Sequence, residues 1–158
     1  MRLIAILALL ASQNAPPKDF SVRISFTTCV AEDMDTATGH FRRSLGTGAE
    51  ASAKVRLTAA DLRKVYDAVV AAKFWELPER LEPIVTPDGT ITVTSPGTLL
   101  KIEVRRDRSS RTVQYDTGRS GSADPRIERF NGLFKTIADV FRDKPQVKSL
   151  PGFQVFCL

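Results

Sequence analysis

The sequence predicts an α+β fold in which a mainly antiparallel sheet of about six strands carries two helices on one face. Several short segments alternate apolar and polar residues, which is the period of a half-buried strand. Two longer segments, residues 58–73 and 124–144, place apolar residues at helical spacing after strong capping signals. Neither helix links strands in a regular βαβ alternation, so the pattern favours antiparallel pairing.

Length and composition indicate one ordinary globular domain. The chain has 158 residues, of which 42% are hydrophobic and 26% are charged, with a formal net charge of +5. These values exclude a disordered, collagen-like or multi-span membrane protein. One histidine and two cysteines leave little material for metal or nucleophile chemistry. We therefore expect no cofactor and no metal.

The N-terminus has the composition of a secretory signal peptide. Met1 and Arg2 precede an apolar run over residues 3–10, and small and polar residues follow to residue 15. The run is much shorter than the ~20 residues that span a bilayer. We expect residues 1–15 to be a signal peptide and residues 16–158 to form a single domain without a transmembrane segment. A buried N-terminal helix or strand is the alternative.

Export changes the meaning of the two cysteines, Cys29 and Cys157. In an oxidising compartment, periplasmic or extracellular, a lone pair of cysteines usually forms a disulfide. We expect this bridge to fasten the C-terminal tail to the end of the first strand, with the tail pairing as a strand beside residues 20–28. Two free, buried thiols are the alternative.

The first half of the chain predicts three strands and a helix. Residues 20–26, 41–45 and 53–57 carry alternating or apolar strand patterns, whereas residues 30–40 interrupt them and indicate a loop. Thr58 and Asp61 stand at the N-cap and N3 positions of a helix that runs to about Lys73. An apolar corner, residues 74–78, follows that helix.

The second half predicts three more strands and a second helix. Strand-forming runs occupy residues 91–94, 99–105 and 111–115, and residues 107–110 join the last two as a hairpin. Asp124 before Pro125 is a strong helix start, and Pro145 ends the apolar stripe that follows. The remaining tail is apolar, so we expect it to pack on the domain.

The capping and core motifs resemble a layout found in small exported bacterial proteins of unknown function. The motifs are Leu57-Thr-x-x-Asp-Leu62, Phe74-Trp-x-Leu-Pro78, Asp124-x-x-x-x-Arg-Phe130 and Leu150-Pro151. The chain is also distantly similar to emfourin, a bacterial inhibitor of thermolysin-like metalloproteases, in its strands and helix opening. No inhibitory residue matches a particular position. The resemblance implies a binding module, inhibitor-like in character, more than an enzyme.

Few residues suggest catalysis or metal binding. His40 is the single histidine and has no nucleophile-elbow pattern near it, so a solvated loop residue is the simpler interpretation. Asp33 and Asp35 lie in an acidic stretch, but an EF-hand register starting at Asp33 fails at three later positions. The sequence leaves open whether this stretch binds a metal.

Four arginines gather around the predicted hairpin: Arg105, Arg106, Arg108 and Arg111. Guanidinium groups bind phosphate or carboxylate in a bidentate manner, which makes these residues candidate contacts for an anionic partner. The alternative is a solvated sheet edge that discourages aggregation. Nucleic acid is not expected, because stacking aromatics are scarce here and the protein is predicted to be exported.

Together these observations predict an exported, non-enzymatic domain that acts by contact with a protein or a cell-envelope component. Two other functions remain open at this point. One is a small hydrolase that uses a pair of carboxylates, whose separation no sequence can show. The other is a purely structural envelope component.

Overall fold

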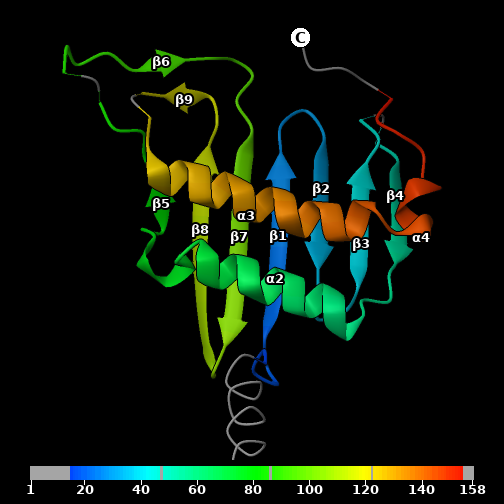
Figure 1. Ribbon diagram of the computed structural model, residues 1–158. Helices are drawn as coiled ribbons and strands as arrows, with labels where there is room; N and C mark the ends of the chain where they lie inside the picture. The colour runs from blue at the N-terminus through cyan, green and yellow to red at the C-terminus, as the bar shows by residue number, and fades with distance from the viewer. Residues whose placement is uncertain (1–14, 47, 86, 122, 155–158) are drawn as a thin grey trace, which may run out of the picture.

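The computed structural model describes residues 15–154 except residues 47, 86 and 122, and it confirms the α+β class (Figure 1). A seven-stranded, mostly antiparallel sheet carries the two long helices on one face. In chain order its strands are β1 (Ser21–Thr27), β2 (Ala31–Asp35), β3 (His40–Ser44), β4 (Glu50–Lys54), β5 (Arg80–Leu81), β7 (Leu99–Arg106) and β8 (Ser109–Asp116).

The spatial order of the sheet is β4-β3-β2-β1-β7-β8-β5. Every neighbouring pair is antiparallel except β5 with β8, which is parallel. The chain therefore builds one half of the sheet as a meander, crosses it with a helix, and adds the β7–β8 hairpin beside β1. Two short strands, β6 (Thr92–Val93) and β9 (Arg119–Ser120), form a separate antiparallel pair above the β5 end of the sheet (Figure 1).

Helix α2 (Ala59–Ala71) begins with the predicted capping box. The Thr58 hydroxyl accepts a hydrogen bond from the Asp61 amide at 3.1 Å, and the Asp61 carboxylate accepts one from the Thr58 amide at 2.8 Å. Two of the amide groups that a helix start leaves without partners are satisfied in this way. The short 3-10 helix η1 (Phe74–Glu76) then forms the predicted apolar corner, with Phe74 fully buried.

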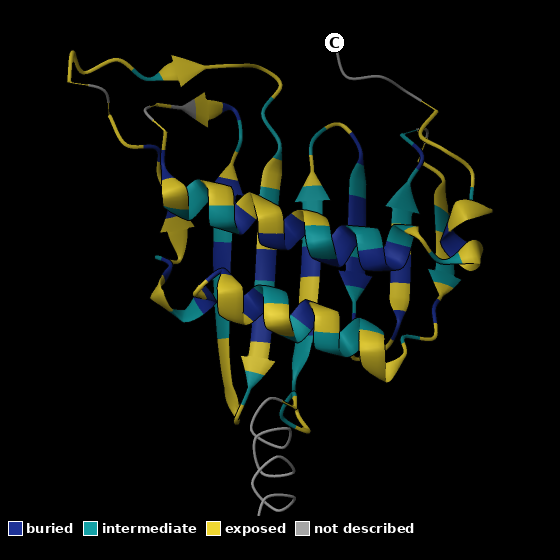
Figure 2. Ribbon diagram, viewed as in Figure 1, coloured by how far each residue is buried: buried dark blue, intermediate teal, exposed yellow. Residues whose placement is uncertain are grey.

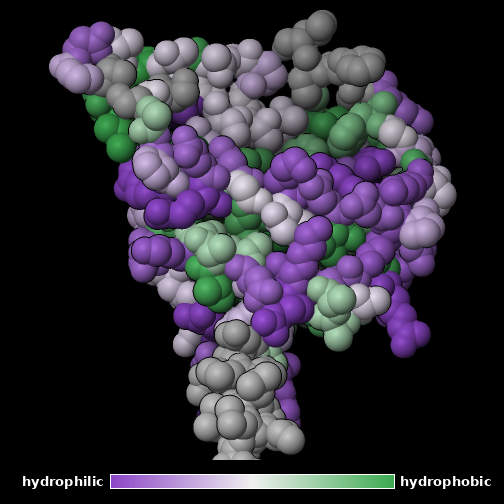
Figure 3. Space-filling view, viewed as in Figure 1, coloured by the Kyte–Doolittle hydropathy of each residue, from purple (hydrophilic) through white to green (hydrophobic). Residues whose placement is uncertain are grey.

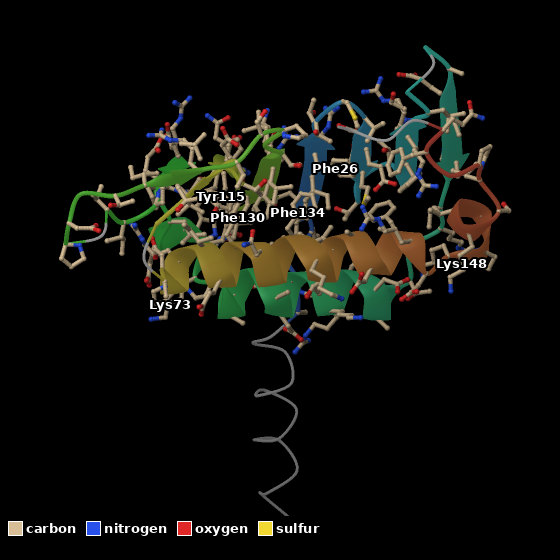
Figure 4. All side chains as sticks on the ribbon, turned by 90° about the horizontal axis from the view of Figure 1, so that it is seen from above. Phe26, Lys73, Tyr115, Phe130, Phe134 and Lys148 are labelled. Atoms are coloured by element: carbon tan, nitrogen blue, oxygen red, sulfur yellow. The ribbon has the colours of Figure 1, made fainter. Side chains whose placement is uncertain are left out.

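Helix α3 (Pro125–Arg142) supplies the largest apolar contribution to the core. Its N-cap is Asp124, as predicted, and Phe130 and Phe134 point from the helix toward the sheet (Figure 4). The buried faces of β1, β2, β3, β7 and β8 meet them, so a single core lies between the sheet and the helices. Figure 2 shows buried residues along α3 and in the middle of the strands behind it. A last short helix, α4 (Pro145–Lys148), packs against β4.

The predicted loop over residues 30–40 is correct only for residue 30 and the turn at residues 36–39, because residues 31–35 form β2 inside the sheet and His40 is the exposed first residue of β3. Residues 31–35 lack the alternation of apolar and polar residues that predicts a strand. Their two inward residues are Glu32 and Met34, and the charged Glu32 interrupts the apolar series. Glu32 is only 2% exposed and is neutralised by arginines from other elements. Ion pairs with other elements thus allow a glutamate on the inward face of a strand, which the local sequence pattern disfavours.

Two other strand predictions also need correction. Strand β4 lies at Glu50–Lys54, earlier than the predicted 53–57, because an edge strand of alanine and serine has no strong apolar alternation. Residue 55 instead donates its amide to the Gly39 carbonyl at 2.7 Å and leads into α2. The predicted strand over residues 91–94 is real as β6, but it lies outside the main sheet.

Candidate interaction surface

The four arginines that the sequence singled out do not share one surface. Arg106 and Arg111 lie on the helix-bearing side of the sheet, in line with the buried Val104 and Val113, and Arg105 lies on the opposite side. Arg108 occupies the β7–β8 turn with a left-handed φ of 62°. The four residues therefore do not form one continuous surface, and contact of their guanidinium groups with an anionic partner stays a prediction.

Two of these arginines hold the corner after α2. The Arg106 guanidinium lies over the Trp75 ring, 4.6 Å from its centroid. The Arg111 guanidinium donates two hydrogen bonds to the Leu77 carbonyl, one of them at 3.2 Å. Both contacts attach η1 to the β7–β8 hairpin, so these side chains have structural roles. Arg105 and Arg108 remain the exposed members of the set.

The turn that carries Arg108 is fixed by a carboxylate from the start of the domain. Asp19 accepts hydrogen bonds from the backbone amides of Arg108 at 2.7 Å and Asp107 at 3.0 Å. These bonds, with the Arg108 bond the larger contribution, lower the pKa of Asp19 below its ordinary value. Asp19 is thus a turn clamp, and its ionised form stabilises the hairpin.

The acidic stretch divides between the two faces of the sheet. Glu32 points into the helix-bearing side, whereas the Asp33 carboxylate accepts hydrogen bonds from the Arg23 guanidinium at 3.0 and 3.1 Å. The Asp35 carboxylate accepts one from the Ala37 amide at 2.8 Å. Within the part of the chain that the structure describes, no group of three or more histidine, cysteine or acidic residues is arranged to hold a metal ion.

The predicted disulfide falls partly outside the described residues, because Cys157 is not among them. Cys29 lies in the turn between β1 and β2, directly past the end of the first strand as expected. The described tail cannot pair beside β1, since β2 and β7 occupy both edges of that strand. Instead the tail reaches β1 through a side chain: the Phe153 ring packs edge-on against Phe26, with centroids 6.1 Å apart.

The feature that the sequence analysis missed is the loop over residues 82–98, called here the 82–98 loop. It extends beyond the β5 end of the sheet and is exposed along most of its length (Figure 2). Ile84, Val85 and Val93 are 45%, 51% and 72% exposed, and Leu99, directly after the loop, is 44% exposed. Elsewhere in the described residues, only Val70 and Phe153 are large hydrophobic side chains with comparable exposure.

The two ends of this loop are fastened to the segment after β8. The Thr98 amide donates to the Thr117 hydroxyl at 3.0 Å, and the Thr94 amide donates to the Gly118 carbonyl at 2.7 Å. Pairing of β6 with β9 adds a ladder, and the Arg119 guanidinium bonds the Glu82 carboxylate at 3.1 Å. An exposed apolar loop is thereby presented on a firm support.

Glycines permit the close packing at this support. A Cβ atom on Gly121 would lie 2.0 Å from the Ile84 carbonyl oxygen, and one on Gly97 would lie 2.8 Å from Gly118. Any side chain at these positions would push the backbones apart. The prolines and glycines at residues 87–89 and 95–97 are typical of turns, but only the fold shows that the neighbouring apolar residues stay exposed.

A shallow pocket lies at the foot of the loop on the helix-free side of the sheet. It is lined by Arg80, Leu81, Glu82, Pro83, Leu99, Gln114, Asp116 and Arg119. The pocket joins apolar surface from Leu99 and Pro83 to charged groups of both signs. Surface of this kind suits an apolar anchor flanked by polar contacts.

Figure 3 views the helix-bearing side, where charged and polar residues cover most of the two helices. An open apolar groove lies between them, lined mainly by small residues: Ala68, Ala71, Ala72, Arg129, Gly132, Leu133 and Thr136. Helices α2 and α3 contact each other along this groove. The groove is a consequence of helix packing, and the exposed large side chains lie elsewhere.

Carboxylates with a lowered pKa have structural roles. Arg126 donates hydrogen bonds to Asp124, and these bonds lower the pKa of that N-cap residue against the opposing effect of burial. For Asp61, burial raises the pKa, but bonds from Lys144 and Thr58 outweigh it and the net shift is downward. These two helix caps and the Asp19 turn clamp lie in three separate places.

No known protein family model matches the chain, and no curated protein matches it. Among the described residues, no helix has the length and apolar character needed to cross a membrane.

Proposed function

We propose that the mature protein is an exported, non-enzymatic binding domain and that the 82–98 loop is its main contact surface for a partner protein. The exposure of Ile84, Val85 and Val93 on one supported loop carries the proposal. Exposed apolar side chains gathered on one loop cost free energy in water unless a partner covers them, and such a loop is a common interaction site.

The polar surroundings of the loop support a protein partner over a lipid surface. Arg119 and Glu82 form an exposed ion pair beside the apolar residues, and Asp116 adds a second carboxylate at the pocket. An apolar centre with a polar rim is typical of protein interfaces. An anionic envelope component would instead be expected to depend on the exposed arginines, Arg105 and Arg108.

Export and the Cys29–Cys157 disulfide belong to the same proposal. The signal-peptide composition of residues 1–15 supports export, and an oxidising compartment would allow the bridge. The path of the tail supports the pairing, because Phe153 contacts Phe26 only three residues before Cys29. N-terminal sequencing of protein from the native host is expected to find a start near residue 16, and an intact Met1 would argue against export.

A pull-down from envelope extract of the native host tests the contact surface. The bait is the mature protein, and mass spectrometry identifies what it retains. Serine replacements of Ile84, Val85 and Val93 are expected to reduce recovery of the partner at least tenfold. The matched control is Val70→Ser, because Val70 is 52% exposed on α2 and lies outside the loop. Equal loss in both variants, or no loss in either, would reject the loop as the contact surface.

The inhibitor-like function is tested separately. The mature protein is added to a thermolysin-like metalloprotease, and the residual activity is measured with and without the loop substitutions. Inhibition by the wild-type protein that the loop variant lacks would make the protease the partner class. Release of product by the protein itself from glycoside or ester substrates would instead favour the carboxylate hydrolase. Retention of the protein by isolated envelope without a discrete protein partner would favour the structural role.

A further inference from the structure

Strand β4 is the last strand at one end of the sheet, with β3 on its inner side. Figure 1 shows it at the end opposite β5, and no described strand lies beyond it. Helix α4 packs against β4, but among the described residues no backbone hydrogen bond to another segment is found at the outer edge of residues 50–54. The outward amide and carbonyl groups of β4 thus have no backbone partner among the described residues, and an edge of this kind can pair with another strand.

The sequence of β4, Glu50-Ala-Ser-Ala-Lys54, is complementary to itself when read in reverse. If two copies pair antiparallel about Ser52, Glu50 of each stands opposite Lys54 of the other. The alanines then face one another. Residues directly opposite in an antiparallel pair have Cβ atoms about 4.5–5.5 Å apart, so each glutamate reaches a lysine.

The side chains of β4 favour this pairing sterically and electrostatically. Glu50, Ser52 and Lys54 lie on the helix-free side, and Ala51 and Ala53 lie on the helix-bearing side. The strand contains no proline, and its small central residues leave room for a second backbone. The Glu50 carboxylate accepts a hydrogen bond from Arg42 at 3.3 Å through one oxygen, which leaves the other for a partner.

We propose that this protein forms a two-fold symmetric dimer by antiparallel pairing of β4 with β4 of a second copy. The two-fold axis passes near Ser52 and is normal to the sheet, so the two sheets become continuous. The 82–98 loops lie at the far ends of the dimer, next to β5, and both remain accessible. Because the seam is short, the association is weak and depends on concentration.

Sedimentation velocity of the mature protein at low salt, over a range of concentrations, tests the proposal with charge variants of the edge. Glu50→Lys alone and Lys54→Glu alone place like charges opposite each other, and we expect each to weaken the dimer at least tenfold. The double variant Glu50→Lys/Lys54→Glu restores opposite charges and is expected to dimerise within a few-fold of wild type. An equimolar mixture of the two single variants is expected to form a heterodimer, because every opposed pair is then Lys with Glu.

The matched control is Lys101→Glu, which makes the same lysine-to-glutamate change as Lys54→Glu. Lys101 also lies on the helix-free side, but in β7, which is an interior strand of the sheet. This variant is expected to dimerise as wild type does, and melting curves establish that every variant is folded. A wild-type protein that is monomeric at all concentrations would overturn the proposal. So would a dimer that is indifferent to the edge charges, or a double variant that stays monomeric.

Discussion

Glu32 is a buried charged residue whose side chain is 1% exposed and lies between two arginines. Arg43 bonds it at 2.7 Å from β3, and Arg142 bonds it at 3.1 Å from the end of α3. Arg43 also donates to the Pro151 carbonyl at 3.0 Å. One buried carboxylate thereby connects the sheet, a helix and the tail.

We expect Glu32→Gln to lower the free energy of unfolding by about 3 kcal/mol, because it removes a buried carboxylate and leaves the largely buried Arg43 without its counter-charge. Urea unfolding of purified protein measures the change. The control is Asp67→Asn, which removes an exposed charge pair with Arg63 within α2 and is expected to cost at most about 0.5 kcal/mol. Equal effects of the two variants would show that Glu32 is not held as described.

A substitution at Gly121 tests whether the close packing beneath the 82–98 loop holds this loop in place. Gly121→Ala places a methyl group against the Ile84 carbonyl and is expected to displace the loop without unfolding the domain. Limited proteolysis is then expected to cleave within residues 82–98 several-fold faster. Gly132→Ala is the control, since a Cβ there meets nothing within 4 Å. A loop that is equally resistant in both variants would contradict the support argument.

At the scale of the elements, the helix caps were predictable because capping is local chemistry. Thr58, Asp61 and Asp124 occupy their predicted roles, each within three residues of its partner amide. Strand β2 was not predictable, because the buried Glu32 carboxylate needs the charges of Arg43 and Arg142. Arg142 is distant from it in sequence. Within residues 82–98 the sequence predicted only the strand over 91–94, because the exposure of the apolar residues there depends on bonds to the segment after β8.

The burial of the apolar face of α3 predicts a large loss of stability when one of its core residues is truncated. Phe130 is fully buried against Tyr115, with ring centroids 6.3 Å apart. Phe130→Ala is expected to destabilise the protein by about 3–5 kcal/mol, through lost burial and the cavity that remains. Val70→Ala on the exposed side of α2 is expected to stay within about 0.5 kcal/mol. Urea midpoints compare them, and a tolerated Phe130→Ala would place α3 outside the core.

The N-cap residue of α3, Asp124, is expected to make the stability of the protein depend on pH. The pKa of Asp124 is below its ordinary value of 3.8 in the folded protein, so the unfolded chain binds this proton more tightly. Its contribution to stability is therefore complete above about pH 4 and disappears as pH falls through the lowered pKa. Asp124→Asn keeps a good N-cap but loses the charge that pairs with Arg126.

We expect Asp124→Asn to be about 1 kcal/mol less stable at pH 7 and to converge with wild type toward pH 2. Unfolding free energies measured at pH 7, 5, 4, 3 and 2 give both curves. Parallel curves over this range would show that the ionised form of Asp124 does not stabilise the helix.

On the scale of the whole molecule, the tail is the segment whose attachment is most open to test. Its described part is held by the Arg43–Pro151 bond, the Phe153–Phe26 contact and a 3.0 Å bond from the Gln154 amide to the Leu45 carbonyl. The predicted Cys29–Cys157 bridge would add a covalent constraint on a long loop. For a loop of about 100 residues the chain-entropy model gives about 4.7 kcal/mol, and measured gains are often smaller.

Thiol titration of unfolded, non-reduced protein from its native compartment is expected to find no free sulfhydryl group. A reductant should then lower the melting temperature, and Cys29→Ser should match the reduced protein. Two titratable thiols would overturn the disulfide and weaken the argument for export.

The sequence by itself determined the α+β class, both long helices with their caps, and most of the strands, because these depend on periodicity and on contacts a few residues apart. Only the tertiary structure decided which charged residues are buried, which arginines share a face, and where exposed apolar residues gather. Those properties depend on partners far along the chain: Arg142 bonds Glu32, and Gly121 lies against Ile84 although the β7–β8 hairpin separates the two residues in sequence. A local sequence pattern does not show these partners, because the fold of the whole sheet brings them together.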